Sequence, residues 1–115
     1  MIDLDSIVNT EEELDGLEEV VMGLIINSGQ ARSLAYAALK QAKEGDFTQA
    51  WELMTQSKLA LHEAHLVQTK LIEADAGEGK TKVSLVLVHA QDHLMTSMLA
   101  RELISELIEL HEKIK

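Results

Sequence analysis

The residues best able to do chemistry lie in one short stretch, where polar side chains interrupt an apolar run. The stretch reads Leu-Val-Leu-Val-His-Ala-Gln-Asp-His-Leu-Met from residue 85 to residue 95, and its polar members are His89, Gln91, Asp92 and His93. An unpaired polar group buried in such a run costs about 1–3 kcal/mol, and a buried unpaired charge costs more. We therefore expect these side chains to be satisfied by one another, by another subunit, by a cation or by a substrate.

On a helix, three of these four residues share one face. His89, Asp92 and His93 stand at positions i, i+3 and i+4, whereas Gln91 projects from a different side. Such a face could bind zinc, although a site supplied by one helix is uncommon. It could also carry a phosphoryl group, because neutral imidazole is a nucleophile near pH 7 and neighbouring side chains could bind the phosphoryl oxygens. Structural histidines are the third alternative, although Asp92 would still need a partner.

Glycine-marked breaks divide the chain into the helices that must position these residues. A capping-box pattern at Thr10–Glu13 starts the first helix, whose apolar seam covers Leu17–Ala42 in steps of four and three. Gly45 then suits a helix end, and Asp46 with Gln49 three residues later starts a second helix. The spacing therefore predicts two long helices joined by a short turn.

The second seam runs from residue 47 to residue 71, and its helix is expected to end near Ala76. Gly77–Lys80 is the flexible connection to a third helix, which is expected from about Lys82 to Ile114. The later half of that helix follows an ordinary amphipathic pattern, with the apolar positions Leu99, Leu103, Leu107 and Leu110.

Three helices of this length, joined by short turns, pack antiparallel. The sequence therefore predicts an all-α fold: an antiparallel three-helix up-down-up bundle in one domain over residues 1–115, with residues 1–9 as a flexible N-terminal tail. The third helix is apolar almost all round over residues 83–88, so it must be covered on more than one side. Three helices cannot supply that cover, and we expect oligomerisation.

Composition excludes several classes of function. The net charge of −10 argues against a nucleic-acid partner and against adhesion to anionic membranes. The absence of cysteine excludes disulfides and thiolate chemistry. Residues 1–9 lack the basic start of a signal peptide, and no apolar stretch approaches the ~20 residues that would allow direct membrane insertion. We therefore expect a cytoplasmic protein.

Five blocks of sequence carry a resemblance to a known family. They are Asn27–Ser33, Ala42–Phe47, Glu63–His65, Gln68–Thr69 and Val88–Thr96. In these blocks the chain resembles the lactose/cellobiose-type enzyme IIA of the bacterial sugar phosphotransferase system. The resemblance covers about Glu18–Glu112, and its most specific part is the block that contains His89.

The resemblance implies a phosphotransferase system component that assembles as a homotrimer of nine helices. His89 would accept a phosphoryl group from the phosphocarrier HPr on its Nε2 atom, forming a tele-phosphohistidine intermediate, with supporting contacts from Gln91 and His93. The group would pass to the cognate IIB component and, indirectly through the membrane IIC component, to a β-linked disaccharide. N,N'-diacetylchitobiose is the expected sugar, with cellobiose or lactose as alternatives.

The resemblance also implies a metal ion at Asp92. This aspartate would meet its two symmetry mates on the trimer axis around one divalent cation, taken as Mg²⁺. Electrostatics is consistent with this cation, because three carboxylates repel one another at low dielectric and oxygen ligands suit a hard cation. The alternative function is a trimeric helical metal-binding scaffold or adaptor without phosphoryl transfer.

Overall fold

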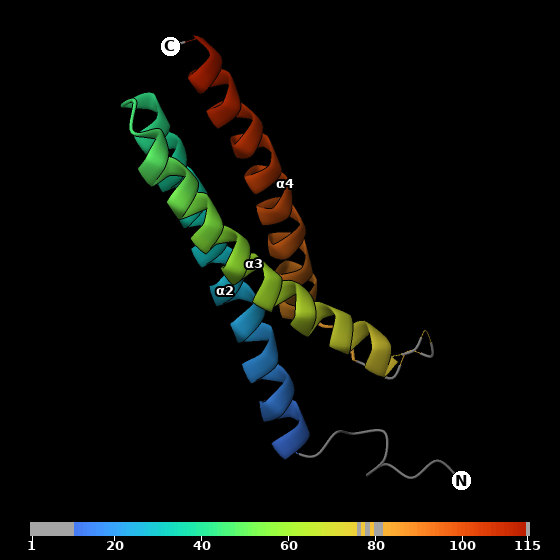
Figure 1. Ribbon diagram of the computed structural model, residues 1–115. Coiled ribbons are helices and arrows are strands. Elements are labelled where there is room, and N and C mark those ends of the chain that lie inside the picture. Colours follow the sequence, from blue (N-terminus) through green and yellow to red (C-terminus); the bar gives the residue numbers. More distant parts are fainter. Residues whose placement is uncertain (1–10, 76, 78, 80–81, 115) are drawn as a thin grey trace, which may run out of the picture.

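The computed structural model describes residues 11–75, 77, 79 and 82–114, and the predicted flexible tail at residues 1–9 lies outside them. Within the described residues, all regular elements are helices: α2 (Glu11–Lys43), α3 (Phe47–Asp75) and α4 (Leu85–Ile114). The prediction of an all-α fold with three long helices is confirmed. In Figure 1 the chain runs up α2, back along α3 and up again through α4. None of the described helices is long and apolar enough to cross a membrane.

The turn between α2 and α3 follows the predicted pattern. Gly45 adopts a φ of +87°, a left-handed conformation that glycine accepts without the steric cost of a Cβ atom. Asp46 caps α3, because its Oδ1 atom accepts a hydrogen bond from the Gln49 backbone N–H at 3.1 Å. This short turn places the two helices antiparallel and side by side.

Helix α4 begins three residues later than predicted, at Leu85 instead of about Lys82. Ser84 accounts for the difference, because its Oγ atom accepts a hydrogen bond from the Leu87 backbone N–H at 3.1 Å. Its carbonyl oxygen accepts the bond from the Val88 N–H at 3.0 Å. This is the geometry of an N-cap residue, which satisfies donors that a helix start leaves unpaired.

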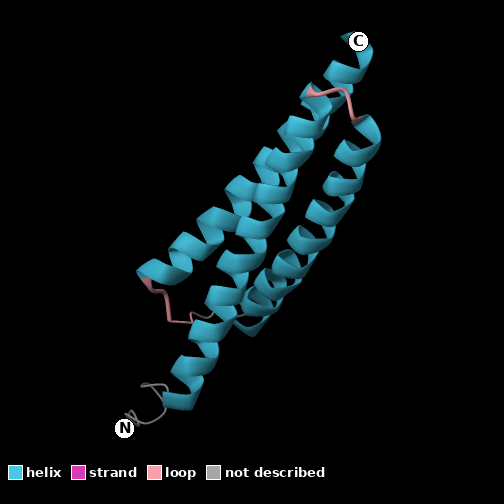
Figure 2. Ribbon diagram, turned by 90° about the vertical axis from the view of Figure 1, so that its left-hand side faces the viewer, coloured by secondary structure: helices cyan, strands magenta, loops and turns pink. Residues whose placement is uncertain are grey.

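The core is formed mainly around α2. This helix packs against both α3 and α4, whereas α3 and α4 contact each other less (Figure 2). The predicted α2 seam is buried throughout its central part, at Val21, Leu24, Ser28, Ala31, Ala35, Ala38 and Ala42. Small side chains in this seam allow the helices to approach closely. Larger side chains fill the space at the two ends of the bundle, with Leu24 of α2 and Leu94 of α4 in one core cluster and Ile108 of α4 in the other.

The apolar pattern in the later half of α4 has a different role from the one predicted. Leu99, Leu103, Leu107 and Leu110 are between 41% and 55% exposed, whereas Ile104 and Ile108 face the bundle and are buried. The expectation of an ordinary amphipathic helix is therefore wrong, because α4 carries two apolar faces. The bundle covers one of them and leaves the other on the subunit surface.

Side-chain hydrogen bonds connect α4 to α3 across the half of the bundle near the α2–α3 turn. Arg101 donates from Nη2 to the Met54 carbonyl oxygen at 3.2 Å, and Trp51 donates from Nε1 to the Glu112 carboxylate. Burial lowers the pKa of the Arg101 guanidinium, while neighbouring Glu102 acts in the opposite direction. These bonds attach α4 to α3 beside the apolar cluster that contains Met54, Ile104 and Ile108.

Replacing Leu94 should test the packing that supports the polar stretch of α4. Its side chain is fully buried in the cluster formed with Leu24, Leu87 and Ala90. Leu94→Ala should lower the free energy of unfolding by about 2–5 kcal/mol in urea titrations followed by circular dichroism. The control is Ile114→Ala, at a position that is 71% exposed. This substitution should change the free energy of unfolding by less than about 0.5 kcal/mol. Equal effects would contradict this description of the core.

Candidate functional site

Helix α4 places the polar stretch partly outside the core. The side chains of His89 and Asp92 are exposed, and those of Gln91 and His93 are half-buried. The core-facing positions of this part of α4 are apolar or small, and they are Leu87, Ala90, Leu94 and Ser97. Helical periodicity turns His89 and Asp92 outward, so one subunit leaves these two side chains available to another subunit, a cation or a substrate.

The structure brings His89 and His93 together. Their imidazole rings stack on successive turns of α4, with centroids 5.9 Å apart and an angle of 9° between the planes. Each neutral imidazole offers one nitrogen lone pair and one N–H group. The pair can therefore present a nucleophilic nitrogen and a hydrogen-bond donor to the same small anionic group.

Gly29 of α2 leaves the space that His93 uses. A Cβ atom built at Gly29 would lie 3.4 Å from His93 Nε2, which is a close but ordinary van der Waals contact. A methyl group would therefore fit, whereas a longer side chain would enter the volume of the imidazole. The glycine allows α2 and the His89–His93 pair to lie against each other.

Two substitutions at Gly29 should separate its helix propensity from its role beside His93. Gly29→Ala should raise the free energy of unfolding by about 0.5–1 kcal/mol, because alanine is the better helix former. It should preserve the nuclear Overhauser contacts between the His89 and His93 rings. Gly29→Leu should displace His93 and abolish those contacts. Preserved ring contacts in Gly29→Leu would contradict the close approach.

Gln91 lies apart from the two histidines. Its Oε1 atom accepts a hydrogen bond from Gln68 Nε2 of α3, and the bond is partly buried. Since residues two apart differ by about 200° around a helix, Gln91 points to the α3 side of α4 while His89 does not. The subunit therefore does not bring Gln91 to its own His89.

Gln68 contacts the site through Gln91, a role that the sequence patterns did not assign to it although it lies in one of the blocks that carry the resemblance. It occupies a position of the α3 seam and is only 9% exposed. A glutamine in a mostly apolar seam needs a polar partner, and that signal was visible in the sequence. Its partner was not visible, because it depends on how α3 and α4 pack.

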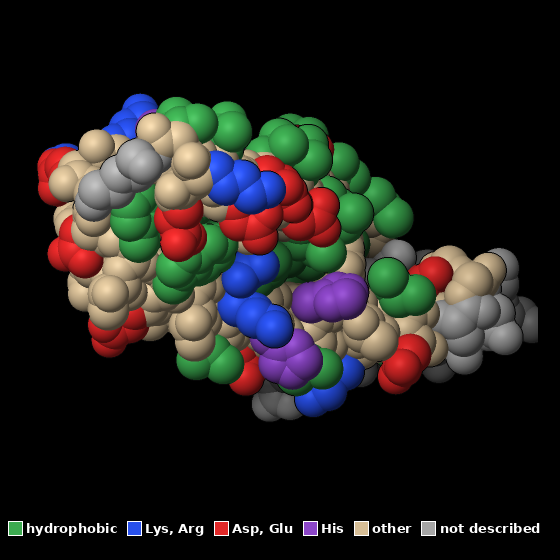
Figure 3. Space-filling view, turned by 45° about the horizontal axis from the view of Figure 1, so that its top comes forward, with side chains coloured by type: hydrophobic (Ala, Val, Ile, Leu, Met, Phe, Trp, Pro, Cys, Tyr) green, Lys and Arg blue, Asp and Glu red, His purple; other side chains and the backbone are tan. Residues whose placement is uncertain are grey.

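Asp92 stands in the exposed apolar face of α4. Its neighbours on that face are Leu85, Val88, Met95 and Leu99, which are 85%, 50%, 54% and 55% exposed. Figure 3 shows hydrophobic side chains gathered in a row on the surface. Covering a charged group inside this apolar face costs free energy unless the covering partner neutralises the charge. Asp92 is therefore a position of this face where a covering partner must supply charge or ligands.

The described residues of one subunit do not form a metal site by themselves. Among the residues that the structure describes, no three histidine, cysteine or acidic side chains converge in a way that could hold an ion. Asp92 offers one carboxylate, whereas a hard divalent cation takes about six oxygen ligands. Asp92 therefore fits a cation only if carboxylates from other copies and water complete the coordination.

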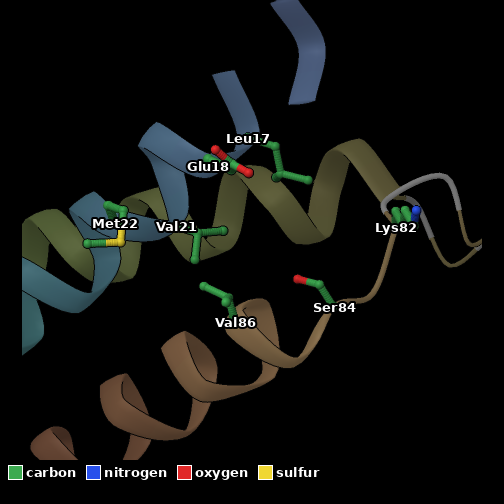
Figure 4. A pocket seen from close by; sticks show the side chains of 7 residues that line it. All are labelled: Leu17, Glu18, Val21, Met22, Lys82, Ser84 and Val86. Carbon is green, nitrogen blue, oxygen red and sulfur yellow. The ribbon is translucent and has the colours of Figure 1, made fainter. Parts of the chain in front are cut away.

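An apolar groove lies between the first half of α2 and the start of α4. It has a volume of about 370 Å³, and Val21 and Val86 point toward each other across it (Figure 4). Glu18 and Lys82 are the ionisable residues in its lining. The groove does not contain the histidine pair, so we do not assign it a reacting substrate.

Comparison with known proteins connects this geometry to one family. Residues 19–112 match the family model of the lactose/cellobiose-specific IIA subunit of the phosphotransferase system. The chain is 80% identical to the N,N'-diacetylchitobiose-specific EIIA component of Escherichia coli strain K12, over 100% of this chain and 99% of that protein. It is 41% identical to the lichenan-specific enzyme IIA component of Bacillus subtilis, over 85% and 89% of the two chains.

Solved structures are similar over nearly the same length. The IIA(chitobiose) chain in solution structures of its complex with HPr from Escherichia coli is 85% identical, with a TM-score of 0.76. That match covers 85% of this chain and 95% of the other. The cellobiose-specific enzyme IIA of Bacillus anthracis is 42% identical, with a TM-score of 0.82 and 96% of both chains covered.

Proposed function

Because this chain belongs to the lactose/cellobiose-specific IIA family of the sugar phosphotransferase system, we propose that it carries a phosphoryl group from HPr on His89. The observation that supports this choice of residue is the exposed His89 imidazole stacked on His93. A carrier must meet two partners in turn, so its reactive atom has to be accessible at the surface. The chain is accordingly a phosphotransferase component that acts through a phosphohistidine.

The chemistry at His89 requires little beyond alignment and charge stabilisation. The lone pair of the neutral imidazole, at Nε2 in our proposal, forms a bond to phosphorus as the bond to the donor's nitrogen breaks. The phosphoryl oxygens remain negative throughout and accept hydrogen bonds only. His93, stacked beside His89, is positioned to donate one such bond.

The donor and the sugar follow from the relatives. HPr is the partner in the complex of the 85% identical IIA(chitobiose) chain, and N,N'-diacetylchitobiose is the sugar named for the 80% identical component. We propose the same donor and the same sugar here. The acceptor would be a cognate IIB component, which serves a membrane IIC component from the cytoplasmic side.

We further propose that three copies assemble through the exposed apolar face of α4, giving a nine-helix trimer. Burial of this face would remove Leu85, Val88, Met95 and Leu99 from water, and burial of apolar surface drives association. Asp92 lies in the middle of the face, so three carboxylates would meet on the axis. They would hold one divalent cation, for which Mg²⁺ is our proposal, and the cation would offset their repulsion.

Incubation with phosphoenolpyruvate, enzyme I and HPr tests the proposed function. The chain should gain the mass of one phosphoryl group, and acid should remove it, as expected for a phosphohistidine. The competing function is a metal-binding scaffold without phosphoryl transfer, and nothing in the family comparisons favours it. A chain that remains unphosphorylated under these conditions would overturn the carrier proposal.

A further inference from the structure

We propose that a buried layer of three serines divides the subunit into two packing units, and that the unit carrying His89 and His93 opens without unfolding the other. The serine layer consists of Ser28 of α2, Ser57 of α3 and Ser97 of α4, each of which is 0% exposed. Each helix contributes one serine, so the layer crosses the whole bundle. The inference concerns the packing of the subunit and does not depend on the phosphoryl chemistry.

Two separate clusters of buried apolar side chains lie on either side of the serine layer. The site cluster consists of Val21, Leu24, Ala64, Leu87, Ala90 and Leu94. The turn cluster lies toward the α2–α3 turn and consists of Ala35, Ala38, Ala42, Ala50, Met54, Ile104 and Ile108. Along α2, Ser28 falls between Leu24 of the site cluster and Ala35 of the turn cluster. Ser57 on α3 and Ser97 on α4 fall between the two clusters in the same way.

The serine layer joins the two clusters weakly, because two of its hydroxyl groups have no hydrogen-bond partner within the described part of the chain. Ser57 donates from Oγ to the Ala31 carbonyl oxygen at 2.6 Å. The buried Oγ atoms of Ser28 and Ser97 are the two without a partner there. A buried hydroxyl without a partner costs free energy, whereas an apolar side chain in its place would add to the packing. The bundle is therefore least tightly held at this level.

The composition of α2 changes at the same level. All three glycines of α2, from Gly16 to Gly29, lie before residue 30, and all five of its alanines, from Ala31 to Ala42, lie after it. Alanine is the best helix former, and glycine is one of the poorest. The half of α2 that contributes to the site cluster is therefore intrinsically less stable than the half that contributes to the turn cluster.

The histidine pair belongs to the less stable unit. His89 and His93 lie on the stretch of α4 that contributes to the site cluster. Among the described side chains, one α3–α4 hydrogen bond lies in this unit, between Gln68 and Gln91, whereas two lie in the unit of the turn cluster. For the proposed carrier, which meets two partners in turn, opening of the first unit lets the surface around the pair adapt while the second holds the helices together.

Native-state hydrogen exchange of the full chain, followed by nuclear magnetic resonance, tests the division. Amides at residues 20–27 of α2 and 61–68 of α3 should share one free energy of opening, because they belong to one cooperative unit. Their protection factors should be at least about tenfold below those of residues 34–42 and 50–56. Amides of α2 and α3 are the ones to compare, because copies that associate through α4 would protect α4 itself.

The dependence of exchange on low concentrations of urea distinguishes a cooperative unit from fraying. Amides at residues 20–27 and 61–68 should respond with one common slope, because they expose the same surface when they open. Protection that falls gradually along each helix toward its end would overturn the inference. Equal protection in the two units would overturn it as well.

Substitutions in the serine layer test its role as the weak level. Ser28→Ala and Ser97→Ala each remove a hydroxyl that has no partner among the described residues, so each should raise the protection of residues 20–27 at least about fivefold. Ser57→Ala is the matched control, because it makes the same change in the same layer but removes a bonded hydroxyl. It should not raise this protection.

The comparison separates the loss of an unpartnered hydroxyl from the gain in helix propensity that every serine-to-alanine change brings. An equal rise in Ser57→Ala would assign the effect to propensity and overturn the role of the layer. Unchanged or lower protection in both Ser28→Ala and Ser97→Ala would also overturn it. Circular dichroism of each variant should show the helix content of the wild type.

Discussion

His89→Gln is expected to abolish phosphorylation of the chain by phosphoenolpyruvate, enzyme I and HPr. Glutamine resembles histidine in size and polarity but has no nucleophilic ring nitrogen, so the nitrogen–phosphorus bond cannot form. Because His89 is exposed, the substitution should leave the core clusters and the free energy of unfolding nearly unchanged. Intact-mass spectrometry should therefore show a folded chain without the mass gain of one phosphoryl group.

The matched control is His62→Gln, which changes an exposed histidine of α3 outside the stacked pair. It should retain full phosphorylation. His93→Gln should be phosphorylated more slowly, because it removes the stacked imidazole but keeps the acceptor nitrogen of His89. Phosphorylation of His89→Gln to the wild-type level would show that another residue carries the group.

Asp92→Leu is expected to make the oligomer independent of divalent cations. In the wild type, chelation should leave three carboxylates facing one another and raise the concentration at which the trimer dissociates by at least about tenfold. Leucine removes the repulsion and continues the apolar stripe between Val88 and Met95. Sedimentation velocity with and without chelator should show dissociation in the wild type alone.

Glu109→Leu is the control for Asp92→Leu, because it removes an exposed carboxylate of the same helix away from the stripe. This variant should dissociate on chelation as the wild type does. Adding Mg²⁺ back should restore the wild-type trimer and leave Asp92→Leu unaffected. A wild-type trimer that is equally stable with and without chelator would contradict the axial cation.

The local features of the fold were predictable from neighbouring residues. The turn at Gly45, the cap at Asp46 and the buried α2 seam all follow from short-range patterns, and the structure confirms them. The start of α4 was placed too early because Ser84 acts as the cap, although it stands between Val83 and the apolar run that begins at Leu85. Short-range patterns therefore located the helices to within a few residues.

The surroundings of the candidate site were less predictable. The spacing of His89 and His93 correctly placed the two rings on one face of a helix, and the structure shows them stacked. The partner of Gln91 was not predictable, because Gln68 is distant in the sequence and belongs to another helix. The exposure of Asp92 in one subunit was also not predictable, because the residues around it in the sequence are apolar.

The sequence by itself determined the three helices, the buried seams of α2 and α3 and the family motif around His89, because helix periodicity and motif spacing are properties of neighbouring residues. Only the tertiary structure decided which apolar face of α4 the subunit covers and which it leaves outside with Asp92. It also decided that Gln91 faces Gln68 while His89 stacks on His93. The physical reason is that α4 carries two apolar faces, and the packing of α2 and α3 selects between them.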